Sequence, residues 1–184
     1  MESTKLPAYI SLLLPLVFLV GLVVVIYHNP WFSFTDNALS DMGSVRNPEN
    51  YYFNGFIMLF AVLGFIASLG AFKNGLSYLM PIAMVSLFLV GIFPEEYSLH
   101  TPSATLFYVL ALADIVLIGL KLARSGLSVG MLWAILSVVT FVLMVYIVKA
   151  RVFKGLAIPE LIGAAMILAW FTYIGLLQIR GSQL

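Results

Sequence analysis

Long apolar stretches separated by short polar segments run along the whole chain. Six stretches approach the ~20 residues that a helix needs to cross the hydrocarbon core of a bilayer. They lie at about 7–27, 51–72, 76–93, 103–122, 129–148 and 157–179. The spans are expected to be helices, because unpaired backbone groups are costly in lipid and the alternating pattern of a membrane barrel is absent. The pattern predicts an all-α polytopic membrane protein, a compact bundle of six transmembrane helices in a single domain over residues 1–184.

The composition supports this class of protein. Of 184 residues, 62% are hydrophobic and 9% are charged, whereas a soluble domain is about 45–50% apolar and about 25% charged. The formal net charge of +1 provides no basic field for nucleic acid. The absence of cysteine excludes disulfides, thiolate metal sites and a cysteine nucleophile. We expect no cofactor and expect membrane lipid as the partner, while the oligomeric state stays open.

The distribution of charge predicts an orientation in the membrane. One side, with both termini and the loops near 72–76 and 121–127, carries five Lys and Arg residues against four on the other. Cytoplasmic loops usually hold the excess, so we expect a multi-pass plasma-membrane protein with both termini in the cytoplasm. The cluster Lys149, Arg151 and Lys154 argues against this orientation. Six acidic residues fall on the predicted outer side: Asp36, Asp41, Glu49, Glu95, Glu96 and Glu160.

The long first loop, 29–50, contains the first candidate site. Positions 31, 34, 38 and 42 are apolar at near-helical spacing. A polar stripe runs between them: Asn37, Ser40, Asp41 and Ser44. Thr35 could cap a helix here and Gly43 could end it. We expect a short amphipathic helix in the membrane interface, either a plain surface helix or a lid whose Ser40 and Asp41 face a pocket.

The third loop, 94–102, adds His100 at the start of the fourth span, close to Glu95 and Glu96. A neighbouring carboxylate can orient a histidine for acid–base chemistry, although a solvated interfacial histidine is the simpler interpretation. His28, His100 and Asp41 are weak candidates for metal ligands. No HExxH motif or i, i+4 histidine pair supports them, so no metal site is predicted.

Two further acidic residues lie within spans. Asp114 is the one charge deep inside a span, and it must be paired or protonated and face the bundle interior. It is either a proton relay or a hydrogen-bonded pin between helices. Its expected partners are hydroxyls of neighbouring spans: Ser68, Ser86, Ser137 or Thr140. Glu160, just inside the sixth span, is expected to lie near the positive N-terminus of that helix.

Two short motifs carry a family resemblance. Leu-Ser-Asp-Met-Gly at 39–43 followed by Asn54, and Gly-Ile-Phe-Pro at 91–94 followed by His100, resemble domain-of-unknown-function family 998. The resemblance implies six membrane helices, and it matches Ser40, Asp41, Asn54 and His100 to the polar positions of the family, without implying a chemistry. A looser similarity to membrane lipid hydrolases of the alkaline ceramidase type fails at the metal ligands, because those enzymes use three histidines and this chain has two.

Three functions remain open. In the first, an outward-facing polar pocket under the first loop binds a lipid or small amphiphile, and the candidate ligand-binding residues are Asn37, Asn54, Glu95, Glu96 and Asp114. In the second, the protein is an intramembrane hydrolase or transferase that uses Ser40 with Asp41 and His100. In the third, it is a small proton-coupled transporter that uses Asp114. The lack of an inverted repeat and of a second intramembrane charge counts against the third.

Overall fold

The computed structural model describes residues 5–181, and all regular structure in this part of the chain is helical. The elements in chain order are α1 (Lys5–His28), the 3-10 helix η2 (Leu39–Gly43), α2 (Asn50–Lys73), α3 (Met80–Ile92), α4 (His100–Arg124), α5 (Val129–Lys149) and α6 (Ala157–Ile179). Five of them, all but α3 and η2, are long and apolar enough to cross a membrane. The prediction of an all-α polytopic membrane bundle is confirmed.

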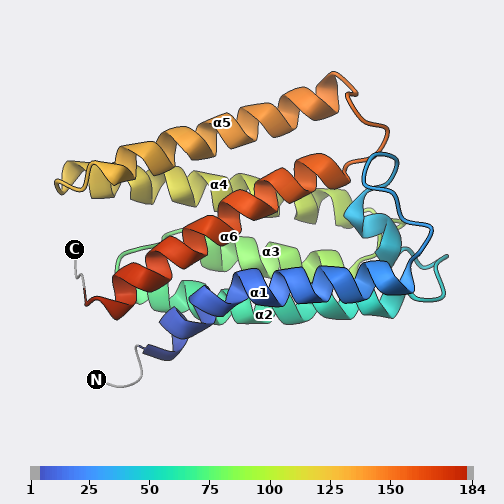
Figure 1. Cartoon of the computed structure of the whole chain (residues 1–184), viewed down its shortest axis with the longest axis horizontal. Coiled ribbons are helices and arrows are strands. Elements are labelled where there is room, and N and C mark those ends of the chain that lie inside the picture. The colour runs from blue at the N-terminus through green and yellow to red at the C-terminus, as the bar shows by residue number, and fades with distance from the viewer. Residues whose placement is uncertain (1–4, 182–184) are drawn as a thin grey trace.

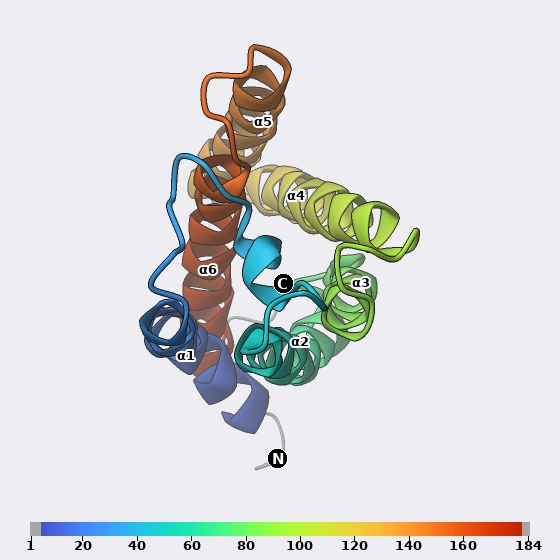
Figure 2. The same ribbon diagram turned by 90° about the vertical axis from the view of Figure 1, so that its right-hand side faces the viewer.

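The connections between helices alternate between the two ends of the bundle (Figure 1). α1 begins and α6 ends at the same end as the turns at 74–79 and 125–128. At the opposite end, called the η2 end below, η2 lies together with the loops 93–99 and 150–156 (Figure 1). Seen from the η2 end, α1, α2, α3, α4 and α6 surround the centre, η2 covers it, and α5 lies outside (Figure 2).

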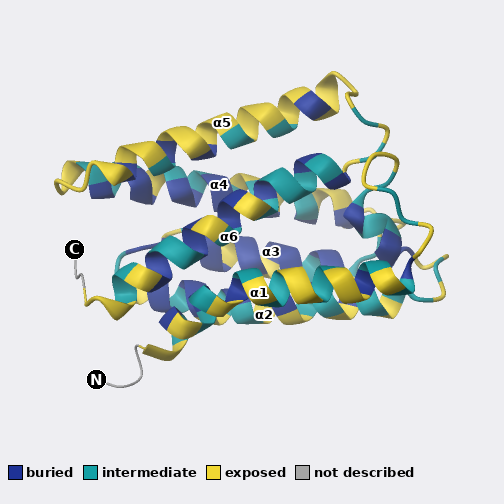
Figure 3. Ribbon diagram, in the orientation of Figure 1, coloured by how far each residue is buried: buried dark blue, intermediate teal, exposed yellow. Residues whose placement is uncertain are grey.

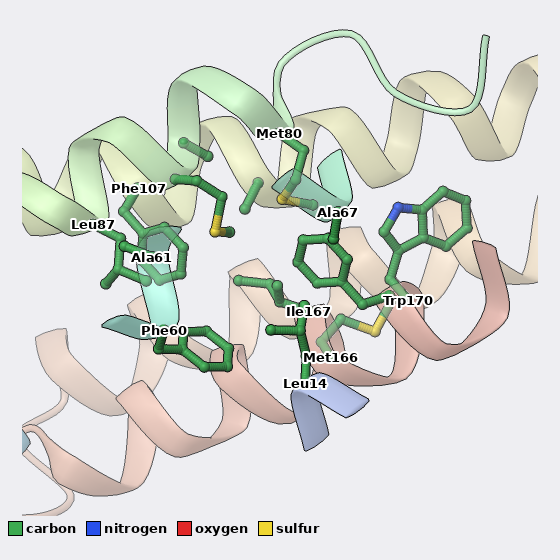
Figure 4. Close-up of a cluster of buried hydrophobic side chains, with 14 of the residues drawn as sticks. Leu14, Phe60, Ala61, Ala67, Met80, Leu87, Phe107, Met166, Ile167 and Trp170 are labelled. Atoms are coloured by element: carbon green, nitrogen blue, oxygen red, sulfur yellow. The ribbon is translucent and has the colours of Figure 1, made fainter. Parts of the chain in front are cut away.

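The hydrophobic core is built by the five central helices. Figure 4 shows Leu14 of α1, Phe60 of α2, Leu87 of α3, Phe107 of α4 and Trp170 of α6 within one cluster of buried side chains. α5 contributes little to it: within residues 5–181 none of the buried side chains of this cluster comes from α5, and only the partly buried Trp133 and Met144 pack against it. Figure 3 shows this contrast as a largely exposed α5. Its outward side chains are apolar, as expected of a helix that faces lipid.

α4 and α5 approach most closely at a pair of glycines. A Cβ atom on Gly119 would lie 2.6 Å from the carbonyl oxygen of Gly130 and 3.0 Å from the backbone nitrogen of Ala134. Small residues permit such close contact between membrane helices. From this contact the two helices diverge toward the η2 end (Figure 1), which leaves room between them where the cleft described below lies.

The third span differs from the prediction of 76–93. Its helix begins at Met80 and has 13 residues, or about 20 Å at ~1.5 Å per residue, which is shorter than the ~30 Å hydrocarbon core. The preceding segment, 74–79, is irregular. The buried Asp114 carboxylate accepts the Ser77 hydroxyl at 2.9 Å and the backbone N–H groups of Tyr78 and Leu79 at 2.6 and 2.7 Å. Asp114 therefore satisfies backbone donors that lipid could not.

The prediction of which hydroxyl groups bind Asp114 was wrong. Ser68 and Ser86 donate to carbonyls of their own helices, and Ser137 donates to the Leu112 carbonyl at 2.8 Å. Asp114 instead caps the start of α3, where free N–H groups favour a carboxylate. These contacts agree with the pin interpretation, since Asp114 joins α4 to the segment before α3.

The first loop is less helical than predicted. Helix η2 covers five residues and ends at Gly43, as expected, but it begins at Leu39, and its N-cap is Ala38 rather than Thr35. Residues 30–38 form turns and irregular backbone. The Asp41 carboxylate accepts the Ala38 N–H at 3.0 Å. A carboxylate at the third position of a helix that accepts the N–H of the N-cap residue fixes the start of that helix, so η2 begins at Leu39 and not earlier in the loop.

Candidate functional site

A cleft of about 730 Å³ opens at the η2 end, within the ~300–1,000 Å³ range of small-molecule sites. Its polar end lies against η2 and the start of α4 and includes Ser40, Asp41, Arg46, Glu95, His100 and Lys149. From there it continues between α4 and α5 along apolar side chains: Ala104, Val109, Phe141, Met144, Val145 and Val148. The divergence of α4 and α5 thus creates a cleft that is polar at one end and apolar at the other.

Many of the residues predicted from sequence lie together in this cleft. Those that line it are Ser40, Asp41, Glu95, Glu96 and His100. Asn37 stands beside them, because its Nδ2 donates to the Asp41 carboxylate at 3.1 Å. The elements that meet here are the first loop, the loop before α4, and the facing ends of α5 and α6.

Three other predicted residues lie elsewhere. Asn54 is buried and donates its Nδ2 to the Gly43 carbonyl at 3.0 Å, so it holds the end of η2. The ring of His28 stacks on Tyr52 with centroids 3.7 Å apart. Asp114 caps α3. Within residues 5–181, no three His, Asp or Glu side chains are grouped so that they could hold a metal ion.

Carboxylates from two distant segments hold the first loop in place. Glu160 of α6 accepts the Leu39 N–H at 2.7 Å, and Glu96 accepts the hydroxyl of Ser44 and the N–H of Val45. The hydrogen bond from Ser44 lowers the pKa of Glu96. Glu160 lies in the first turn of its own helix, as expected, and its oxygen also caps the start of η2. These two acidic side chains are therefore partly occupied by the loop.

The first loop forms the roof of the cleft, and the loop 150–156 is attached to it. Backbone N–H groups of Gly155 and Ala157 donate to the carbonyls of Thr35 and Asn37 at 2.9 and 3.0 Å. Gly155 is required here because a Cβ atom would overlap the backbone of Asn37. Lys154 adds an exposed ion pair with Asp36 at 3.1 Å. The roof of the cleft is thus fixed to the beginning of α6.

Glu95 and Asp41 form a carboxyl pair at the polar end. Partial burial, a hydrogen bond with Asp41 and repulsion from its charge raise the pKa of Glu95 to about 7. Two carboxylates that share a site cannot both ionise at low cost. The polar end of the cleft therefore brings two acidic side chains close together.

His100 is 7% exposed and is held in one orientation. Its Nδ1 lies 2.7 Å from the Phe93 carbonyl oxygen. A carbonyl can only accept, so Nδ1 carries the hydrogen in this contact. Among residues 5–181, Nε2 makes no hydrogen bond to the protein. His100 consequently presents to the cleft a ring nitrogen that no group in this part of the chain engages.

Arg46 and Lys149 complete the polar end, and sequence reasoning used them only to judge orientation. Both side chains line the cleft, and within residues 5–181 neither lies within 4.0 Å of a carboxylate oxygen. Lys149 is the last residue of α5. A cation at the end of the fifth span, on the side that the charge bias predicts to be outer, was the signal in the sequence that could have identified it.

A smaller pocket of about 60 Å³ lies next to the cleft, on the side toward the centre of the bundle. It reaches into the bundle between apolar side chains such as Phe18, Ile57 and Phe60. Residues that line both the cleft and this inner pocket include Ser40, His100, Ala104, Tyr108 and Glu160. Ser40 and His100 thus lie between the cleft and an apolar interior.

Five long apolar helices, with outward apolar side chains and a polar cleft at one end, define a multi-pass α-helical membrane protein. The chain belongs to the family described as protein of unknown function (DUF998), whose model matches residues 12–177. The family predicted from the motifs at 39–43 and 91–94 is confirmed. No curated protein and no solved structure matches the chain.

Proposed function

We propose that the protein binds a membrane lipid or small amphiphile, with the head group under η2 and the chain between α4 and α5. The observation that supports this is the division of one cleft into a polar end and an apolar groove. From His100 to Val109 the groove follows nine residues of α4, or about 14 Å of helix. That length accommodates part of an acyl chain.

The head group supplies the selectivity in this proposal. An acyl chain that leaves the bilayer for the groove exchanges one apolar environment for another, so the hydrophobic effect contributes little. Hydrogen bonds and charge pairs at the polar end are formed in a partly dehydrated cleft and discriminate between head groups. A small, polar, pre-positioned end with an apolar extension is the usual form of a ligand site.

A cleft-filling substitution tests the proposal. Val145→Trp places an indole in the groove between α4 and α5, whereas Val139→Trp adds the same ring on an exposed part of α5 that is outside the cleft lining. Native mass spectrometry of the protein in mild detergent, titrated with bacterial phospholipids, measures retained lipid. We expect Val145→Trp to lose bound lipid and Val139→Trp to keep it. Equal retention by both variants would refute the proposal.

We place the protein in the plasma membrane with the η2 end outward, as the five-to-four excess of Lys and Arg on the other side favours. The cysteine-free chain makes this orientation testable. Ser98→Cys lies at the η2 end and Ser125→Cys at the other, and both serines are exposed. Labelling of Ser98→Cys alone by an impermeant maleimide on whole cells supports the orientation, and labelling of Ser125→Cys alone reverses it.

Hydrolysis or group transfer at the same cleft is a second candidate. The observation in its favour is the free Nε2 of the buried His100 beside a cleft that Ser40 also lines. A base must come within about 3 Å of the nucleophile it activates. A fluorophosphonate probe that labels the protein at Ser40, and fails to label His100→Asn, would support an enzyme. The absence of labelling would leave binding as the function. No comparable observation favours a transporter, because Asp114 is engaged at the start of α3.

A further inference from the structure

Within residues 5–181, the two cations that line the polar end of the cleft form no ion pair within 4.0 Å, whereas nearby carboxylates accept hydrogen bonds from the first loop. Glu160, Glu96 and Asp41 each accept a backbone N–H of the first loop. Arg46 and Lys149 have no such engagement within residues 5–181. The strongest donors left for a ligand are therefore a guanidinium and an ammonium, which bind phosphate oxygens.

The same end also offers acceptors for a cationic donor. The buried His100 lines the cleft with an Nε2 that has no protein partner in the described chain. Glu95 lies against Asp41, and both side chains line the cleft. An ammonium group would donate hydrogen bonds here and offset the repulsion between the two carboxylates.

We infer that the head group taken up by the cleft carries both a phosphate, bound by Arg46 and Lys149, and a primary ammonium, bound by His100 and the Asp41–Glu95 pair. Phosphoethanolamine lipids have this chemistry. The inference rests on the proposed function, since it names the class of amphiphile that the cleft selects. A phosphocholine head lacks the N–H donors, and a phosphoglycerol head lacks the positive charge.

Three lipids with identical acyl chains test the inference on the full chain in mild detergent. Native mass spectrometry compares phosphatidylethanolamine, phosphatidylcholine and phosphatidylglycerol at equal concentrations. A hydrogen bond to a charged group contributes ~1.5–3 kcal/mol, and 1.4 kcal/mol is tenfold in affinity. We therefore expect phosphatidylethanolamine to bind about tenfold more tightly than either of the others. Equal binding of the three lipids overturns the inference.

Paired variants assign each half of the head group. Arg46→Gln with Lys149→Gln should weaken all three lipids alike, whereas Glu95→Gln should remove only the advantage of phosphatidylethanolamine. The control variants are Arg151→Gln and Glu49→Gln, which change charges outside the cleft lining and should leave the order of affinities intact. Loss of the advantage in a control variant would show that general charge, and not the cleft, sets the preference.

Two outcomes separate this inference from the proposed function. If Val145→Trp abolishes binding of every lipid but the wild-type protein shows no preference for the amine, the cleft binds amphiphiles and the inference fails. If Val145→Trp binds normally, the proposed function itself fails. Free O-phosphoethanolamine, added as a competitor, distinguishes a lipid from a water-soluble ligand: displacement of the lipid at micromolar concentration would assign the site to the soluble compound.

Discussion

The Glu160 carboxylate accepts the backbone N–H of Leu39 at 2.7 Å, although 121 residues separate the two in the chain. This contact joins the first turn of α6 to the first turn of η2. It fixes the first loop, which covers the cleft, to the start of α6, and it does so without a positively charged side chain. Other contacts between 35–39 and 154–160 run beside it.

Removal of the Glu160 carboxylate should release the first loop. Hydrogen bonds to charged groups contribute ~1.5–3 kcal/mol. We therefore expect Glu160→Ala to lower the free energy required to open the first loop by about that amount, and Glu160→Gln to lower it less. The chain has no cysteine, so Leu39→Cys, at a site 8% exposed, reports opening through its rate of maleimide labelling. Unchanged labelling in Glu160→Ala would contradict this role.

Substitution of Asp114 should destabilise the whole bundle. Its carboxylate accepts three hydrogen bonds at the start of α3, and Asn would turn a donor toward these donors. Because one amide oxygen could still accept from the two N–H groups, we expect Asp114→Asn to cost about 1.5–3 kcal/mol through the loss of charge, measured as a lower melting temperature in detergent. Thr172→Val is the control, because Thr172 bonds only to the Leu168 carbonyl of its own helix. A normal melting temperature with lost proton-coupled transport would instead support a relay.

The glycine contact between α4 and α5 should not tolerate a methyl group. A Cβ on Gly119 would lie 2.6 Å from the Gly130 carbonyl oxygen, and overpacking of this kind costs ~1–3 kcal/mol. We expect Gly119→Ala to lower the melting temperature, while Gly55→Ala, where a Cβ meets nothing within 4 Å, should be neutral. If both variants melt alike, the close approach does not determine the position of α5.

The stability of the protein should depend on pH through Glu95. The pKa of this carboxyl is about 7 in the folded state, raised from 4.5. Between these values the folded state holds a proton that the unfolded state releases, so the free energy of unfolding falls as pH rises from about 5 to 8. We expect Glu95→Gln to flatten this decline in a series of melting curves. A wild-type decline that persists unchanged in Glu95→Gln would assign it to another group.

Most of the fold could be predicted from the sequence, because spans are recognised by length and apolarity alone. Five long helices lie close to the predicted ranges. The third does not, because residues 76–79 continue the apolar stretch but form irregular backbone that hydrogen bonds to Asp114 hold in place. Hydropathy cannot detect that Asp114 replaces the hydrogen bonds of a regular helix, because the donors belong to the backbone and their acceptor comes from another helix.

The candidate site could be predicted in part. Ser40, Asp41, Glu95 and His100 come from two loops on the same side of the bundle, and the alternation of the spans is enough to place these loops at one end. Lys149 was missed as a site residue, because only the tilt of α5 away from α4 brings the end of that helix to the cleft.

The sequence by itself determined that this chain is a multi-pass helical membrane protein, that its polar residues gather at one end, and which family it belongs to. These properties follow from local composition and from motifs that need no partner. The tertiary structure decided which carboxylates hold the first loop, which helix Asp114 caps, and where a cleft opens. Those outcomes depend on contacts between segments up to 121 residues apart and on the close approach of two glycines, which no local pattern encodes.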